Sequence, residues 1–135
     1  LRLAFGEVSG YQDGTLEAPF QTVFSGLFER AKEQSHTPPF DLPEKWSQAK
    51  DRLNLNAPVN FVSKVDIIGG NSGSPVVNRK GELVGLIFDG NIHTLPWRHG
   101  YDDKIARAIS VHTGGIIESL RVVYRTNRLL KELQQ

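Results

Sequence analysis

The feature that most constrains the fold is a series of short, β-branched-rich runs separated by Gly, Asn, Lys and Asp. The runs cover residues 60–68, 76–78, 83–88 and 105–111. Runs this short and this closely spaced are typical of the strands of a small antiparallel barrel or sandwich. Between the second and third runs, Arg79-Lys80-Gly81 predicts a tight hairpin link, because glycine readily adopts the positive φ that such links need.

Helical patterns lie on both sides of this β-unit. Residues 1–8 alternate apolar and polar and predict a strand, and residues 11–18 predict a turn-rich connection. Apolar residues at helical spacing predict an amphipathic helix over residues 19–34, followed by a shorter helix after Pro43. Residues 113–135 predict a closing helix that begins at a capping threonine.

Length and charge limit the classes of protein that the chain can represent. The 135 residues fit one structural unit with three segments: a strand and helices over 1–56, a β-barrel with its loop over 57–112, and the helix over 113–135. A net charge of +1 argues against nucleic acid or an anionic membrane as the main partner, and no apolar run reaches the ~20 residues of a membrane span. The absence of cysteine excludes disulfides and a thiol nucleophile.

The most informative stretch is the loop Gly69-Gly70-Asn71-Ser72-Gly73-Ser74-Pro75, which lies between two predicted strands. A catalytic serine needs a tight turn that exposes its hydroxyl, with backbone N–H groups aimed at the oxyanion that its attack creates. Ser72 is therefore the candidate nucleophile, and the N–H groups of Gly70 and Ser72 are the candidate oxyanion donors.

Other glycine-loop motifs fit this stretch less well. The Gly-x-Ser-x-Gly elbow of α/β-hydrolases fails because Ser74 stands where the second glycine would be and a strand follows. A phosphate-binding loop would need Gly-Lys-Ser/Thr at the start of a helix. A glycine-rich β-turn without catalytic meaning is the remaining alternative.

Gly70-Asn71-Ser72-Gly73-Ser74-Pro75 resembles the nucleophile loop of chymotrypsin-like peptidases. The wider strings Asp66–Asn78 and Gly81–Asn91 resemble the bacterial dipeptidyl-peptidase 7 and 11 family. The opening residues 1–8 and Arg107–Val111 resemble it too, so the resemblance covers most of the chain. Asn71 departs from the trypsin pattern, in which an aspartate pairs with a newly cut N-terminus, so activation by that ion pair is not expected.

The resemblance implies a mainly β fold with helices (α+β), namely the C-terminal half of a chymotrypsin-like double β-barrel. It implies a serine exopeptidase that releases dipeptides from peptides with a free N-terminus. Asp89 would then bind the substrate's α-amino group. Gly90 would line the pocket for the second residue and favour hydrophobic side chains. Without the resemblance, Asp89-Gly90-Asn91 favours a type I′ turn over a substrate-binding role.

Of the family's catalytic triad, only the serine has a counterpart in this sequence, at Ser72. The resemblance places the family's histidine and aspartate far upstream of that serine. His36 has no family motif around it, His93 and His99 are predicted at the rim of a loop, and His112 is predicted to be structural. We therefore expect a C-terminal fragment that is inactive alone, without metal or cofactor. Its oligomeric state is left open, a homodimer included.

The resemblance also implies a periplasmic or cell-surface location in a Gram-negative bacterium. Two other functions remain at this stage. One is a chymotrypsin-like endopeptidase, which would lack the anchor for the amino group. The other is a non-catalytic peptide-binding domain with the same fold, which would never have had a general base.

Overall fold

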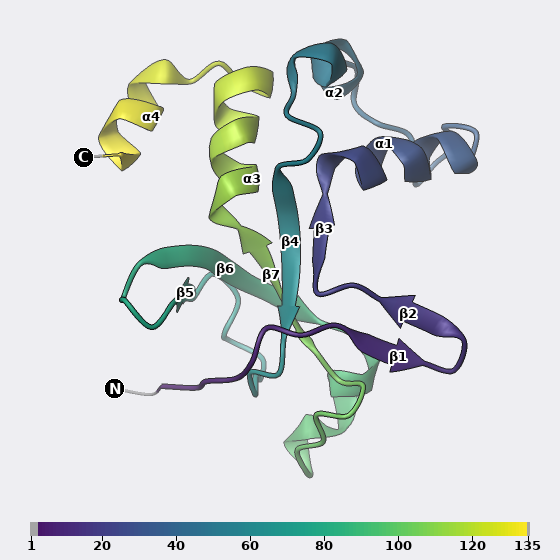
Figure 1. Cartoon of the computed structure of the whole chain (residues 1–135), viewed down its shortest axis with the longest axis vertical. Coiled ribbons are helices and arrows are strands. Elements are labelled where there is room, and N and C mark those ends of the chain that lie inside the picture. The colour runs from purple at the N-terminus through teal and green to yellow at the C-terminus, as the bar shows by residue number, and fades with distance from the viewer. Residues whose placement is uncertain (1–2, 135) are drawn as a thin grey trace. The chain divides into compact units, whose positions relative to one another are not determined.

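The computed structural model describes residues 3–134, and the chain divides into two compact units. The first unit comprises Leu1–Thr22 and Asn60–Thr113, and the second comprises Val23–Val59 and Gly114–Gln135. In Figure 1 the chain runs through the strands β1 to β3, the helices α1 and α2, the strands β4 to β7 and then the helices α3 and α4. Within residues 3–134, no helix is both long and apolar enough to cross a membrane.

A five-stranded sheet forms the body of the first unit. Its strands are β3 (Gln21–Val23), β4 (Pro58–Ser63), β7 (Ala108–His112), β6 (Leu83–Gly90) and β5 (Pro75–Val77), in that spatial order. The last four pair antiparallel with their neighbours. The sheet is open, with β3 and β5 at its edges. Its central strands β6 and β7 run side by side in Figure 1.

The register of the sheet places its buried residues opposite one another. Ser110 of β7 pairs with Phe61 of β4 on one side and with Ile87 of β6 on the other. These three residues are at most 6% exposed. The small side chain of Ser110 between the large side chains of Phe61 and Ile87 keeps the centre of the sheet densely packed.

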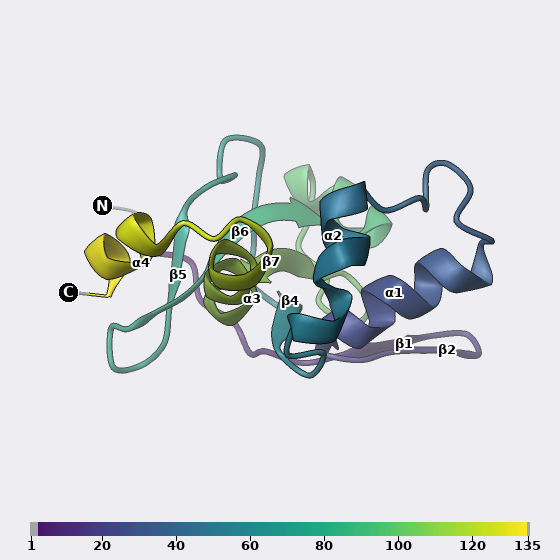
Figure 2. The ribbon, with the colours of Figure 1, turned by 90° about the horizontal axis from the view of Figure 1, so that it is seen from above.

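A two-stranded hairpin precedes the sheet and is tied to it by one buried arginine. β1 (Tyr11–Asp13) and β2 (Leu16–Ala18) form the extended hairpin visible in Figure 2. Arg107, only 3% exposed, donates Nε to the Ser9 carbonyl (2.9 Å) and Nη2 to the Gly10 carbonyl (2.8 Å). Its Nη1 donates to two further backbone carbonyls, those of Asp103 and Ala106. The guanidinium thus satisfies four backbone acceptors and pairs with no carboxylate in the described part of the chain.

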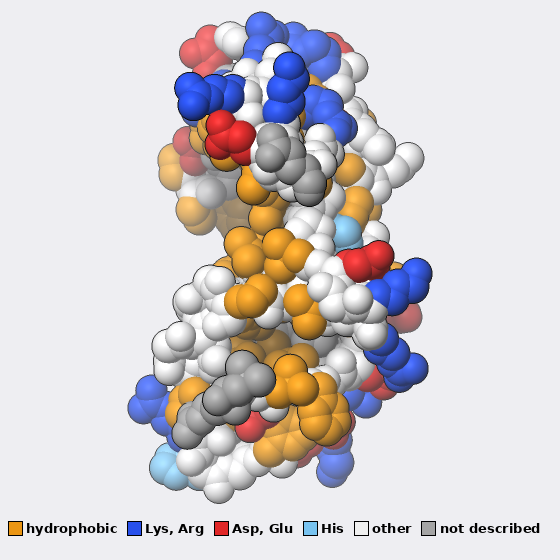
Figure 3. All heavy atoms as spheres, turned by 90° about the vertical axis from the view of Figure 1, so that its left-hand side faces the viewer, with side chains coloured by type: hydrophobic (Ala, Val, Ile, Leu, Met, Phe, Trp, Pro, Cys, Tyr) orange, Lys and Arg blue, Asp and Glu red, His pale blue; other side chains and the backbone are white. Residues whose placement is uncertain are grey.

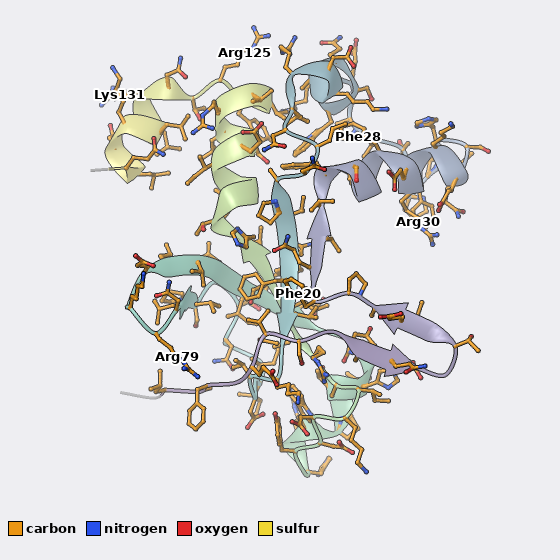
Figure 4. All side chains as sticks on the ribbon, viewed as in Figure 1. Phe20, Phe28, Arg30, Arg79, Arg125 and Lys131 are labelled. Carbon is orange, nitrogen blue, oxygen red and sulfur yellow. The ribbon has the colours of Figure 1, made fainter. Side chains whose placement is uncertain are left out.

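Short helices form the second unit: α1 (Phe24–Glu33), α2 (Glu44–Ala49), η1 (Lys50–Arg52), α3 (Thr113–Glu118), the π-helical turn η3 (Ser119–Val123) and α4 (Asn127–Leu133). Their core is built on Phe28, Ala49 and Leu53. Phe28 lies between α1 and α2 in Figure 4. The end of this unit at the top of Figure 3 is rich in Lys and Arg side chains.

Two of the predicted helices have different bounds in the structure. The first begins at Phe24 rather than at Pro19, because residues 21–23 form β3. The Phe20 carbonyl accepts a hydrogen bond from the Val62 N–H, and such long-range pairing overrides a helical pattern. The closing helix is interrupted after η3, where Arg125 takes a φ of 55° and α4 starts anew at Asn127.

The predicted strand at the start of the chain was wrong for its described part. Residues 3–7 form no strand, and Val8 makes only an isolated bridge to Ser63. Leu1 and Arg2 lie outside the described residues. Apolar residues at alternate positions do not form a strand unless a neighbouring strand pairs with them along their length. The expected turn-rich connection 11–18 instead contains the β1–β2 hairpin.

The remaining elements match the sequence-based expectations. The helix after Pro43 is α2, the four β-runs correspond to the strands β4 to β7 with shifted ends, and the hairpin link is present with Gly81 at a φ of 79°. The α+β class is confirmed. The division into segments 1–56, 57–112 and 113–135 stays a prediction.

Replacement of Arg107 tests the role of this side chain in holding the N-terminal segment. Arg107→Ala leaves four buried or half-buried carbonyls without their donor, which costs about 3 kcal/mol of unfolding free energy. Denaturant unfolding measures the loss, and limited proteolysis around residue 9 detects release of the segment. The matched control Arg79→Ala, on an exposed arginine of the β5–β6 turn, should change stability by less than ~0.5 kcal/mol. Equal stability of the two variants would contradict the assigned role.

Candidate active site

The loop that carries Ser72 is held by hydrogen bonds to strand β6. The Gly73 N–H donates to the Ile87 carbonyl at 2.7 Å, and the Ile87 N–H donates back to the Ser74 carbonyl at 3.1 Å. These bonds continue the β5–β6 ladder beyond Pro75, so the loop is an extension of the sheet. Gly70 (φ 101°) and Gly73 (φ 87°) lie on either side of Ser72 in a backbone region that favours glycine.

Asn71 stabilises the same loop from within. Its Oδ1 accepts the Ile68 N–H at 2.8 Å, and its own N–H donates to the Ile68 carbonyl at 3.1 Å. The Asn71 carbonyl accepts the Ser74 N–H at 2.9 Å, which closes the turn around Ser72. The amide side chain therefore shapes the turn here.

Ser72 is exposed at the tip of this turn, and two backbone donors accompany it. Within residues 3–134, the N–H groups of Gly70 and Ser72 donate to no protein acceptor. They are the two donors that the sequence predicted for an oxyanion, and both remain available to a ligand.

A β-bulge brings a carbonyl to the serine hydroxyl. Ile87 pairs with Ser110 and Asp89 pairs with Ile109, so Phe88 is an extra residue in β6. A bulged residue leaves the ladder and turns its backbone away from the partner strand. The Ser72 hydroxyl donates to the Phe88 carbonyl at 3.2 Å.

Asp89 and Gly90 end strand β6 directly after the bulge. Gly90 pairs with Ala108, its N–H donates to Asp89 Oδ1 at 2.8 Å, and the Asp89 side chain is exposed. Gly90 is not among the positive-φ residues, and Asn91 has a φ of −68°. The alternative of a type I′ turn was wrong, since that turn needs positive φ at both central residues.

A pocket of about 210 Å³ lies beside these residues, with Ser72, Asp89 and Gly90 in its lining. The sequence-predicted residues are therefore brought together around one hollow. Its other side is the 3₁₀ helix η2 (Ile92–Arg98), where the sequence predicted only a rim loop. Thr94 and Arg98 of this helix line the pocket.

Thr94 fills the space next to Gly90. A Cβ at Gly90 would overlap Thr94 Oγ1 and lie 2.9 Å from Thr94 Cγ2. The threonine is fixed, because its hydroxyl donates to the Asn91 carbonyl at 2.7 Å. Asn91 in turn binds the Ile105 carbonyl and the Arg107 N–H through its side chain. No local sequence signal reveals the Gly90–Thr94 approach, because it depends on how η2 folds back on β6.

The four histidines do not contact the serine hydroxyl in the described part of the chain. His93 Nε2 lies 2.9 Å from Asp13 Oδ2 of the β1–β2 hairpin, His36 and His99 are exposed, and His112 packs edge-on against Phe61 with ring centres 5.8 Å apart. Over residues 3–134 no three His, Asp or Glu side chains gather in a way that could hold a metal ion.

A serine on a glycine turn, two N–H donors and a pocket thus lie together beside strand β6. The whole chain, residues 1–135, matches the Peptidase S46 family. It is 38% identical over 121 residues to dipeptidyl-peptidase 7 of Phocaeicola vulgatus, covering 82% of this chain and 16% of that protein. It is 30% identical to the Asp/Glu-specific dipeptidyl-peptidase of Shewanella putrefaciens, covering 98% of this chain and 22% of that one. The chain belongs to peptidase family S46.

Solved structures support the same assignment. The crystal structure of Porphyromonas endodontalis DPP11 in complex with the dipeptide Arg-Glu matches with a TM-score of 0.86 and 26% identity, over 97% of this chain and 20% of that chain. The alternate conformation of that protein matches with a TM-score of 0.84. The chain thus spans about a fifth of the length of the relatives that it matches.

Burial lowers the pKa of His112 below its ordinary value of 6.5. In the pH window between the lowered value and 6.5 the unfolded chain binds the proton more readily, so stability falls as the pH drops through this window. NMR titration of the imidazole should give a pKa below 6.5. His112→Phe, which keeps a ring against Phe61, should remove this part of the pH dependence in denaturant unfolding. A measured pKa at or above 6.5 would refute the assignment.

Proposed function

We propose that this chain is the C-terminal, nucleophile-bearing part of a longer serine dipeptidyl-peptidase that releases dipeptides from free peptide N-termini. The observation that carries the proposal is the exposed Ser72 hydroxyl at a pocket, beside two N–H groups that have no acceptor among residues 3–134. Family membership supports it, because relatives in the family are named dipeptidyl-peptidases.

The chemistry follows from the geometry of the loop. Ser72 attacks the carbonyl carbon after the second substrate residue, and the oxygen that becomes negative accepts bonds from the Gly70 and Ser72 N–H groups. Because these donors are held by the loop before substrate binds, they need little reorganisation when charge develops. The bond from the Ser72 hydroxyl to the Phe88 carbonyl is exchanged for one to a general base when that base is present.

The general base and its carboxylate partner come from outside this chain in the proposed enzyme. They belong to the remainder of a chymotrypsin-like double barrel, whose second half the open sheet of the first unit represents. The chain alone is then inactive, since loss of the base from such a triad lowers kcat on the order of 10⁴-fold or more. We place the full-length enzyme in the periplasm or on the cell surface of a Gram-negative bacterium, as the family resemblance implies.

Asp89 anchors the substrate's α-ammonium group in this proposal. Its carboxylate is exposed beside the pocket, and one of its oxygens is already oriented by the Gly90 N–H. Asp89 directly follows Phe88, whose carbonyl contacts the serine hydroxyl, and a fixed carboxylate at this place favours a substrate whose chain ends there. An endopeptidase would have no use for such an anchor.

In this proposal the pocket favours a hydrophobic second residue, because apolar side chains form part of its lining. Ile67, Ile87 and Trp97 contribute to it, and Gly90 adds no side chain. Apolar walls gain free energy in proportion to the apolar surface that they cover.

Substrates with free and blocked N-termini test the exopeptidase assignment in the full-length enzyme. Cleavage of a dipeptidyl coumarylamide should fall at least 10²-fold when the N-terminus is acetylated, because the ammonium–carboxylate pair is lost. Asp89→Asn should weaken selection for the free N-terminus, and Ser72→Ala should abolish cleavage. Ser47→Ala, on an exposed serine of α2, is the control. Equal cleavage of both substrates would favour the endopeptidase.

The size of the pocket depends on the fit of Thr94 against Gly90. Gly90→Ala drives a methyl group into Thr94, so we expect kcat/KM for a substrate with Phe at the second position to fall about tenfold. The double variant Gly90→Ala/Thr94→Ala should recover most of the loss, because it removes the clashing atoms. A single variant with unchanged kcat/KM for both Phe and Ala substrates would argue against a pocket at this position.

A further inference from the structure

One pair of side chains joins the β1–β2 hairpin to the pocket wall η2. His93 Nε2 on η2 lies 2.9 Å from Asp13 Oδ2 at the end of β1. An ionised carboxylate only accepts hydrogen bonds, so the imidazole N–H donates to it, whether the ring is charged or neutral. The two residues are 80 positions apart in the chain, so their contact is a product of the tertiary structure.

Neither side chain of the pair lines the pocket, but His93 directly precedes the residues that do. Its neighbour Thr94 fills the space beside Gly90, and the residues of η2 that line the pocket all follow His93 in the chain. A 3₁₀ helix has about three residues per turn, so these residues belong to the turns that begin at His93. A bond that fixes His93 therefore also fixes the wall.

The hairpin can serve as a support because its base is held independently of η2. The Arg107 guanidinium donates to the carbonyls of Ser9 and Gly10 and lies 5.6 Å from the centre of the Tyr11 ring. β1 pairs with β2 along its whole length, and in Figure 1 the hairpin extends away from the five-stranded sheet. Asp13, at the far end of β1, thus offers a carboxylate on a fixed element.

Other side-chain hydrogen bonds hold η2 near its ends. Asn91 anchors its start, and the Trp97 indole N–H donates to the Asp102 carbonyl at 2.9 Å near its end. Between these two points Leu95 is 73% exposed, so apolar packing contributes little there. In residues 3–134 the bond to Asp13 is the one contact that η2 makes between a basic and an acidic side chain.

We propose that His93 and Asp13 are positioning residues that hold η2 in place and thereby set the room for the side chain of the substrate's second residue. The loop that carries Ser72 is fixed separately, through its bonds to Ile87. Loss of the pair therefore weakens binding in the pocket and leaves the chemical step unchanged. This inference rests on the proposed function, since it concerns the pocket of that site.

Dipeptidyl coumarylamides with Phe or Ala at the second position test the proposal in the full-length enzyme. Asp13→Ala and His93→Ala should each raise KM for the Phe substrate about threefold, with a smaller effect on the Ala substrate and kcat nearly unchanged. The double variant should raise KM no further, because either single substitution already removes the pair. His93→Gln, whose side-chain N–H can still donate to the carboxylate, should keep KM close to the wild-type value.

Two matched controls remove the same kinds of side chain elsewhere. Glu17→Ala removes an exposed carboxylate of the same hairpin that forms no ion pair within the described residues, and His36→Ala removes an exposed imidazole of the second unit. Neither should change KM for either substrate.

A second readout does not depend on catalysis. In the Ser72→Ala background, hydrogen–deuterium exchange followed by mass spectrometry should show faster exchange over residues 92–98 when Asp13→Ala is added, and no change when Glu17→Ala is added.

Three results would overturn the inference while the wild-type enzyme still cleaves substrates with free N-termini. The first is an unchanged KM in both single variants. The second is an equal fall in kcat for the Phe and Ala substrates, which indicates a general structural loss. The third is additive effects in the double variant, which show that the two side chains act separately. An enzyme inactive on every substrate with a free N-terminus overturns the proposed function instead, and the exchange of residues 92–98 then tests the pair by itself.

Discussion

The two hydrogen bonds between Ile87 and the serine loop are the constraint on which the site depends. They join the Gly73 N–H and the Ser74 carbonyl to the middle of β6. Ile87 is also paired with Ser110 at the centre of the sheet. The hydrogen bonds to Ile87 therefore anchor the loop to the paired strands. One residue further along, the bulge at Phe88 directs a carbonyl to the Ser72 hydroxyl. A serine loop built in this way is positioned before any ligand binds, which is the condition that oxyanion stabilisation in the proposed function requires.

A second set of contacts holds the opposite wall of the pocket. Asn91 binds the backbone of residues 105–107 through its side chain and accepts both bonds from Thr94. Arg107 continues this brace to the backbone at Ser9 and Gly10. Thus Thr94 and the start of η2 are held by contacts to Asn91, which is outside the pocket lining. Substitutions of Asn91 or Arg107 should therefore change the shape of the pocket more than the position of Ser72.

The sequence predicted the short strands, the hairpin at Gly81 and the helix after Pro43, because each is encoded by residues close together in the chain. The predictions were wrong where pairing with residues distant in the sequence determines the local structure. Residues 21–23 have a helical pattern but join a sheet edge, and residues 3–8 have a strand pattern but meet only an isolated bridge at Ser63. Likewise, no glycine or proline near Arg125 predicts the break in the helix.

By itself, the sequence determined the kind of chemistry available: a serine between glycines, no thiol, and an acidic residue at the end of the next strand. These are properties of residue type and local turn geometry. Only the tertiary structure decided that Thr94 fills the space beside Gly90 and that Arg98 brings a positive charge over Gly69. Both placements depend on how η2 packs against β6 and the serine loop. Residues 69 and 98 are 29 positions apart, and no local pattern encodes their approach.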